Sequence, residues 1–238
     1  MAQYDSYSPY IAGTSSLEAV NTLFRKVYQY MALGLVLTSL TAWLTASSPA
    51  MIRMFYSSQT PLIIVAVAEI GLVIYLSATI AKHSASTSLL LFSVYSILNG
   101  ITCSVVLLVY TSESVYTAFL STAGMFGAMS LYALYTKRDI TSWGSFLQMG
   151  LLGLIIAMVI NIFVGSTAAE TVISVIGIII FMGLTAYDTA KIKALADGIG
   201  MNDDEAAGKI AVIGALSLYL DFINLFLYLI RLFGKRRD

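Results

Sequence analysis

The chain has 238 residues, of which 58% are hydrophobic and 11% are charged, and its formal net charge is zero. Thirteen basic and thirteen acidic residues are too few to cover the surface of a soluble domain of this size, so lipid is the better solvent. A zero net charge also argues against nucleic acid as a partner. One histidine, His83, and one cysteine, Cys103, exclude a multi-histidine metal site and an internal disulfide.

Seven apolar runs approach the roughly 20 residues that a helix needs to cross the ~30 Å core of a bilayer. We therefore predict an all-α integral membrane protein whose spans cover about 27–47, 61–81, 88–110, 115–135, 144–165, 171–190 and 211–231. Residues 1–26 form a polar N-terminal segment without the basic-then-apolar pattern of a signal peptide. Residues 27–231 form a single transmembrane domain, and residues 232–238 form a basic C-terminal tail.

The distribution of Lys and Arg predicts the orientation of the chain. Arg53 is alone in the three loops of one face, whereas the other face carries Arg25, Lys26, Lys82, Lys137, Arg138, Lys191, Lys193 and Lys209. The positive-inside rule therefore predicts a cytoplasmic N-terminus. Seven full crossings would place the basic tail outside, so either the tail breaks the rule or one segment is re-entrant. The last span is the candidate for re-entry because a charge lies at its centre.

Small residues recur at four-residue spacing in two of the predicted spans. Such pairs let helix backbones approach each other in lipid, where no strong hydrophobic force drives helices together. This spacing predicts packing seams at Ala123 with Gly127, Gly124 with Ala128, and Gly153 with Ala157 and Asn161.

Three acidic residues, Glu69, Asp188 and Asp221, fall clearly within the predicted spans. An Asp at a helix centre makes membrane insertion less favourable by about 2.5–3.5 kcal/mol. The twelve Leu, Ile, Val and Phe residues in 211–230 together favour insertion by about 4–7 kcal/mol. The last helix can therefore insert, with Asp221 facing the bundle interior or a water-filled cavity. Its neighbours on one face form a polar stripe of Ser217, Asn224 and Tyr228. A purely structural alternative is an interhelical hydrogen bond from protonated Asp221, assisted by Asn224.

The other two acids have different predicted partners. Asp188 can pair with Lys191 one turn later, or it can meet Asp221. In the second case like-charge repulsion would make the two acids share a proton, and such a pair can sense pH. Glu69 needs a basic partner, and Arg231 at the end of the last span is the candidate.

Three stretches of the chain resemble one family of membrane proteins. The stretch "GLTAYDTAKIK" (183–193), followed by "ALSLYLDFINLFLYLIRLFG" (215–234), is similar to the C-terminal signature of the Bax inhibitor-1 family in its bacterial inner-membrane branch. The stretch "TAGMFGAMSLYALYTKRD" (122–139) is also similar to that branch. The resemblance begins near residue 20 and covers nearly all of the remaining chain.

The resemblance implies a seven-helix bundle with the last helix at its centre, acting as a pH-sensitive calcium leak. It implies a gate of Asp188 and Asp221, which would contact calcium weakly and transiently, and a second latch of Glu69 and Arg231. Family members with a leak carry a basic residue late in the second helix; here Lys82 is the nearest base and the possible gate partner. Calcium would be the permeating ion, and no motif for a nucleotide, haem or metal cofactor is present.

Two alternatives come from other classes of protein. The chain can be a membrane scaffold that binds a quality-control protease or another membrane partner, with structural buried acids. It can also be an intramembrane aspartyl protease, because Tyr187–Asp188 fits the first motif of that class. However, "LYLD" replaces the second motif, Gly-x-Gly-Asp, and no proline follows residue 61, so we expect no enzyme activity.

Overall fold

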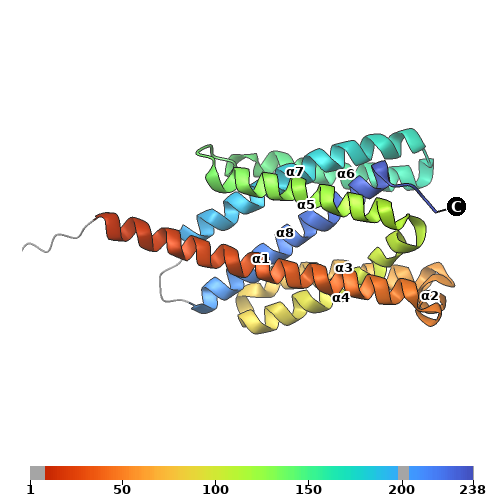
Figure 1. Cartoon of the computed structure of the whole chain (residues 1–238), viewed down its shortest axis with the longest axis horizontal. Helices are drawn as coiled ribbons and strands as arrows, with labels where there is room; N and C mark the ends of the chain where they lie inside the picture. The colour runs from red at the N-terminus through yellow and green to blue at the C-terminus, as the bar shows by residue number, and fades with distance from the viewer. Residues whose placement is uncertain (1–8, 198–203, 238) are drawn as a thin grey trace, which may run out of the picture.

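The computed structural model describes residues 9–197 and 204–237. All the regular elements in these ranges are helices (Figure 1). In chain order they are α1 (Pro9–Ser47), α2 (Pro49–Tyr56), α3 (Gln59–Thr79), η1 (Ile80–Lys82), α4 (Ala85–Val109), α5 (Ser112–Tyr135), η2 (Thr141–Trp143), α6 (Gly144–Val164), α7 (Thr167–Asp197) and α8 (Asp204–Phe233).

Seven of these helices are long and apolar enough to cross a membrane, which confirms the predicted class and number of spans. The boundaries differ most at the first and last spans. α1 begins at Pro9, inside the segment predicted as a polar lead, and α8 begins at Asp204 rather than near residue 211. Within that segment Val20 and Phe24 are buried, so α1 already packs on the core before residue 27. At 1.5 Å per residue, α8 is about 45 Å long and exceeds the thickness of a bilayer core.

Side-chain oxygens and one glycine define several helix ends. Ser48, Ser84 and Thr111 each accept a hydrogen bond from the backbone N–H three residues later, at 3.2–3.4 Å, and so cap the helices that follow them. Gly165 follows the last residue of α6 with a φ of +66°, a conformation that side chains disfavour. These residues therefore lie in the short links between successive helices.

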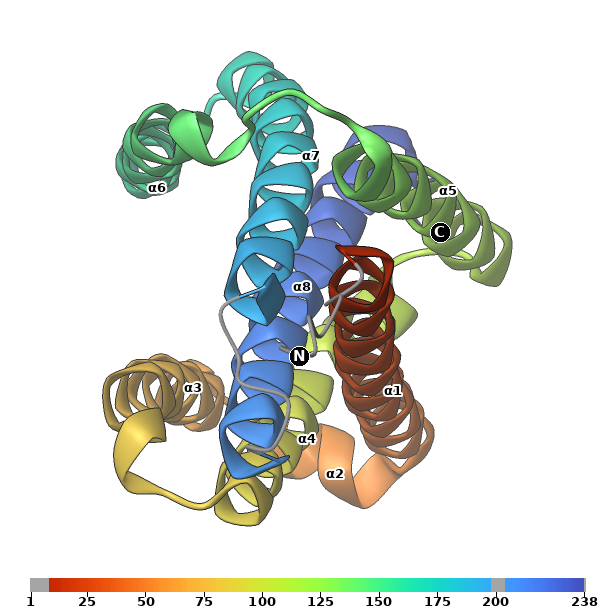
Figure 2. The same cartoon turned by 90° about the vertical axis from the view of Figure 1, so that its left-hand side faces the viewer.

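α8 is the central helix of the bundle, as Figure 2 shows in the view along the helices. In its most apolar 18-residue window 61% of the residues are buried, against 11% for α3 and α6, which lie at the outside. Two clusters of buried side chains meet on α8. Tyr219 belongs to the cluster with Phe92 of α4, and Leu225 belongs to the cluster with Phe181 of α7.

Glycines permit close contact at positions other than the predicted seams. A Cβ atom on Gly100 of α4 would lie 2.7 Å from the backbone oxygen of Thr38, so α1 and α4 touch backbone to backbone there. By contrast, a Cβ atom on Gly124, Gly127 or Gly153 would meet nothing within 4 Å. The predicted seams are therefore wrong at these three glycines, because those faces do not lie against a neighbouring helix.

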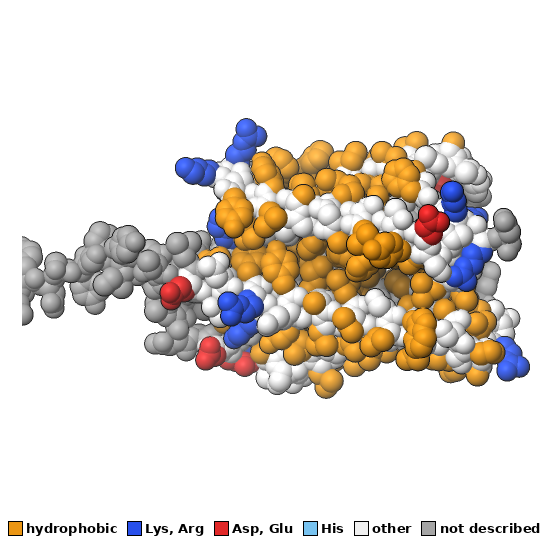
Figure 3. Space-filling view, viewed as in Figure 1, with side chains coloured by type: hydrophobic (Ala, Val, Ile, Leu, Met, Phe, Trp, Pro, Cys, Tyr) orange, Lys and Arg blue, Asp and Glu red, His pale blue; other side chains and the backbone are white. Residues whose placement is uncertain are grey.

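The charged residues gather at the two ends of the bundle, and hydrophobic side chains form a broad band between them (Figure 3). α8 is one continuous helix that runs the length of the bundle, which argues against the alternative of a re-entrant last span. The C-terminal tail lies at the end opposite the start of α1 and pairs with the link between α4 and α5. There Thr111 N–H donates to the Lys235 carbonyl at 3.0 Å and Arg237 N–H donates to the Val109 carbonyl at 2.8 Å.

Candidate functional site

Asp221 lies near the middle of the central helix and is 4% exposed. Helices α1, α4, α5 and α7 all pack against α8, and the next residue, Phe222, makes edge contacts with Phe119 and Phe126 of α5. The Oδ2 atom of Asp221 is buried and has no hydrogen-bond partner among the described residues. A buried polar atom without a partner costs about 1–3 kcal/mol, and more when it is charged, so this position has a reason beyond stability.

The like-charged residue whose charge acts on Asp221 is Asp188 of α7. The carboxyl groups are near enough, across the contact between α7 and α8, for the charge of Asp188 to act on Asp221. Asp188 itself is half-buried, and Lys191 on the same helix is the base whose charge acts on it. The structure thus brings together the two acids that the sequence singled out, while their role as a gate stays a prediction.

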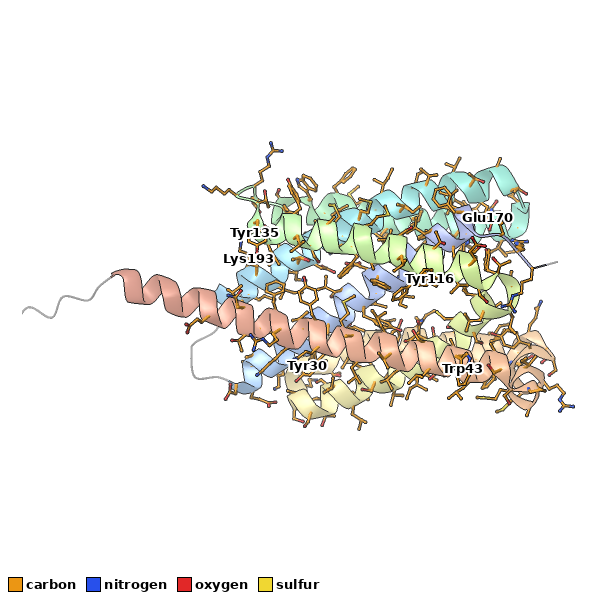
Figure 4. All side chains as sticks on the ribbon, viewed as in Figure 1. Tyr30, Trp43, Tyr116, Tyr135, Glu170 and Lys193 are labelled. Carbon is orange, nitrogen blue, oxygen red and sulfur yellow. The ribbon has the colours of Figure 1, made fainter. Side chains whose placement is uncertain are left out.

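Lys82, the predicted basic partner, lies in η1 at the end of α3 and is exposed. Lys193 is also engaged elsewhere, because its Nζ atom donates to the Leu134 carbonyl at 2.6 Å and caps α5; Figure 4 shows Lys193 beside Tyr135 at that end. The positive charge beside Asp188 therefore comes from Lys191 of its own helix.

The predicted polar stripe on α8 does not converge on Asp221. Asn224 donates from Nδ2 to the Leu220 carbonyl of its own helix at 2.8 Å, and Ser217 is half-buried. Tyr228 is buried, and its hydroxyl donates to the sulfur of Met158 on α6 at 3.2 Å. Asn224 bonds within α8 and Tyr228 bonds to α6, so Asn224 does not assist an interhelical hydrogen bond from Asp221 among the described residues.

The structure also separates the two residues of the predicted second latch. Arg231 lies in the last turn of α8, and its Nε atom is 3.7 Å from Oε1 of Glu170 in the first turn of α7. Glu69 lies in the middle of α3, about 15 Å along the helix from its start, and faces α4. Arg231 therefore pairs with an acid at its own end of the bundle, while Glu69 bonds to α4.

Glu170 and Arg231 line a pocket of about 380 Å³ at the end of the bundle where the C-terminal tail lies. The pocket is bounded by α6, α7 and α8, with Asn161 and Met158 on its wall. Figure 4 places Glu170 at this end. The arginine also lies 5.6 Å from the ring centroid of Tyr228, so it contacts both an acid and an aromatic face.

Glu69 belongs to a hydrogen-bond network within the membrane that was not predicted from the sequence. Its carboxylate accepts hydrogen bonds from Thr102 Oγ1 at 3.0 Å and from Asn99 Nδ2 at 3.4 Å. The amide oxygen of Asn99 accepts from the hydroxyl of Tyr219 at 3.0 Å, and that hydroxyl lies 2.6 Å from Thr38 Oγ1. The network therefore joins α3, α4, α8 and α1, with fully buried Tyr219 at its centre.

Two signals in the sequence could have led to this network. Asn99 interrupts an apolar run of α4, and amides at such positions generally bond to a neighbouring helix. Tyr219 lies two residues before Asp221, on the opposite side of α8. Neither signal identifies a partner, because the partner comes from another helix.

A dedicated metal centre is not formed by the described residues. No group of three or more His, Cys, Asp or Glu side chains within 9–197 and 204–237 is placed to hold a metal ion. The two carboxylates of Asp188 and Asp221 offer a cation only part of the six to eight oxygen ligands that calcium prefers.

Seven candidate spanning helices, six of them arranged around the central α8 with its buried acid, define a polytopic α-helical membrane protein. Residues 20–238 match the family model described as "Inhibitor of apoptosis-promoting Bax1", and the chain belongs to this Bax inhibitor-1 family. It is 45% identical over 218 residues to inner membrane protein YbhL of Escherichia coli strain K12, covering 92% of this chain and 93% of that protein.

Other relatives extend across distant bacteria. An uncharacterized protein of Rickettsia prowazekii is 42% identical over 221 residues, covering 93% of this chain and 92% of that protein. An uncharacterized protein of Borreliella burgdorferi is 39% identical over 218 residues, covering 92% and 94%. The seven spans and the similarity to an inner membrane protein make this chain an integral protein of the inner membrane.

Proposed function

We propose that the chain is a pH-sensitive calcium leak of the inner membrane, gated by protonation of Asp188 and Asp221. The observation that carries the proposal is the environment of Asp221. It is an acid buried in the central helix, one of its oxygens has no partner within the described part of the chain, and its like-charged neighbour belongs to the adjacent helix.

Electrostatics gives this pair two alternative states. Two negative charges repel strongly where the dielectric constant is low, so the pair is stabilised either by a shared proton or by a bound cation. A shared proton would tie α7 to α8, whereas a cation would occupy the space between the helices. Proton concentration would then decide which state is populated, and the contact between α7 and α8 would change with it.

Calcium suits this site as a passing ion rather than a stored one. Two carboxylates, supplemented by carbonyl oxygens and water, bind calcium weakly, and conduction requires that an ion can leave as well as enter. The pocket at Glu170 and Arg231 lies at the start of α7 and the end of α8, and it is the proposed opening on that face. We place the N-terminus in the cytoplasm, so this face would lie outside.

The test is calcium flux from proteoliposomes at pH 6 and pH 8. Wild-type protein should show a flux that changes several-fold between the two pH values. Asp188→Asn and Asp221→Asn should each flatten that dependence, because an amide cannot share the proton. Absence of flux from wild-type protein at both pH values would contradict the proposal.

Asp139 provides a matched control. It is exposed, and hydrogen bonds from the side chain and the backbone of Thr141 hold the pKa of its carboxyl below the usual value. Asp139 therefore stays charged throughout this pH range, and Asp139→Asn should leave the pH dependence intact. If it flattens the dependence as strongly as Asp221→Asn, the gate is not the buried pair.

A further inference from the structure

A lateral groove opens between α1 and α5, toward the end of the bundle where the C-terminal tail lies. Its volume is about 440 Å³, within the range of pockets that hold one small ligand. α4 and α8 also contribute to its walls, which are mostly apolar and include Phe119 and Phe226. Figure 3 shows the hollow among hydrophobic side chains, so the groove faces the hydrocarbon part of the membrane.

Two aromatic residues mark the depth of the groove in the bilayer. Trp43 of α1 and Tyr116 of α5 line it from the two sides, and both are more than half exposed. Figure 4 shows them on the two helices that border the opening. Each lies about one turn from an end of its helix, which is the depth of the headgroup region where Trp and Tyr gather.

A single cation lies at the mouth of the groove. Among the described residues that line it, Arg237 is the one that carries a charge. Its position is fixed, because its backbone N–H donates to the Val109 carbonyl at 2.8 Å and its Nη2 atom donates to Ser112 Oγ at 3.3 Å. The nearby acid Glu113 lines a different pocket on another face of α5, together with Lys235.

We propose that this groove is a phospholipid-binding site, in which an acyl chain lies between α1 and α5 and the phosphate binds Arg237 and Ser112. The groove changes along its length in the same order as a phospholipid does. Its interior is apolar like an acyl chain, its aromatic residues lie at headgroup depth, and the guanidinium at its mouth can bind the phosphate. A guanidinium binds phosphate oxygens by charge-assisted hydrogen bonds. A free anion would use only the mouth, and an uncharged lipid would use only the interior.

The floor of the groove connects this site with the polar core. Phe222 and Ile223, which line the groove, follow Asp221 directly on α8, and Thr38 on the wall bonds to Tyr219. A lipid chain bound here would therefore contact residues beside the candidate gate. The binding site itself does not depend on the proposed calcium leak.

The test is native mass spectrometry of the full chain in detergent, with added dioleoylphosphatidylglycerol or, in parallel, dioleoylglycerol, which lacks the phosphate. Wild-type protein should retain one phospholipid more tightly than the neutral lipid. Arg237→Gln should weaken phospholipid binding about fivefold to tenfold and leave the neutral lipid unchanged. Arg236→Gln is the matched control, because it removes the same charge from an exposed neighbour that does not line the groove.

A second pair of variants tests the position of the acyl chain. Ser39 lines the groove and is exposed, so Ser39→Trp should fill the groove without disturbing the core and weaken binding of both lipids. Leu40→Trp places the same ring at the next exposed position, outside the groove, and should bind as wild type does. Equal effects of Arg237→Gln and Arg236→Gln, or wild-type binding by Ser39→Trp, would overturn the proposal.

Discussion

Arg231 in the last turn of α8 pairs with Glu170 in the first turn of α7, with 3.7 Å between Nε and Oε1. The two side chains are 37% and 40% exposed, so their attraction contributes about 0–1 kcal/mol to stability. Their position matters more than this free energy. They join the end of the central helix to the start of the helix that carries Asp188, at one end of the proposed path.

The first prediction concerns this pair as a latch at the outer end. Glu170→Gln and Arg231→Gln should each raise calcium flux from proteoliposomes at constant pH, because either change removes the ion pair that joins the end of α8 to the start of α7. The double variant should raise the flux no further than the single ones, since the same interaction is lost in all three. Thermal unfolding temperatures should change little.

Glu113→Gln is the control for this series. Glu113 lies at the same end of the bundle, in the first turn of α5, and lines a different pocket. It should leave the flux unchanged. Additive effects of the two single changes in the double variant would show that Glu170 and Arg231 act separately, and the latch would then be rejected.

A second prediction concerns the hydrogen-bond network around Tyr219. Tyr219→Phe removes the hydroxyl that donates to Asn99 and contacts Thr38, both buried. Leaving these groups without that partner should lower the free energy of unfolding by about 1–3 kcal/mol. The measurement is unfolding in mixed detergent micelles with increasing dodecyl sulfate.

Tyr135→Phe makes the same chemical change at a tyrosine that is 83% exposed, and its stability should match that of wild type. If Tyr219→Phe is as stable as Tyr135→Phe, the network does not hold α1, α4 and α8 together. In that case the hydrogen bonds of the Tyr219 hydroxyl contribute nothing to the free energy of unfolding.

Hydropathy was sufficient to predict the seven spans, because insertion into lipid depends on composition along the chain. It could not predict which polar groups meet, because Glu69 bonds to α4 and Arg231 to Glu170 through contacts between helices. The central place of α8 came from family resemblance and is confirmed. Asp221 could be singled out from the sequence because the free-energy cost of inserting a carboxylate depends only on its own helix. The importance of Asn99 and Tyr219 depends on the hydrogen bond between them, which joins two different helices.

Glycine spacing shows the same limit. Gly124 and Gly127 have the spacing of a packing motif but face open space, whereas Gly100, which has Ser96 and Ser104 at the same four-residue spacing, lies against the backbone of α1. Spacing gives the face on which small residues lie, but not whether another helix covers that face. Which helices touch depends on the whole arrangement around α8.

The third prediction uses this contrast. Gly100→Ala would place a methyl group 2.7 Å from the Thr38 carbonyl oxygen and 2.6 Å from Thr41 Cβ, so α1 and α4 must separate. The free energy of unfolding should fall by about 1–3 kcal/mol. Gly124→Ala, which meets nothing within 4 Å, should be neutral or stabilising by up to about 1 kcal/mol, because alanine favours the helix. Equal stability of the two variants would contradict the close contact of α1 and α4.

The last prediction concerns orientation, since seven full crossings place η1 and the C-terminal tail at opposite ends. In a Cys103→Ala background, Arg236→Cys should react with a membrane-impermeant maleimide in intact spheroplasts, whereas Lys82→Cys should react only after permeabilisation. Both positions are exposed, so access to the reagent decides the result. The eight basic residues on the side of Lys82 outweigh the short tail, and this balance should keep that side in the cytoplasm. The reverse pattern would invert the orientation, and equal labelling at both positions would contradict the odd number of crossings.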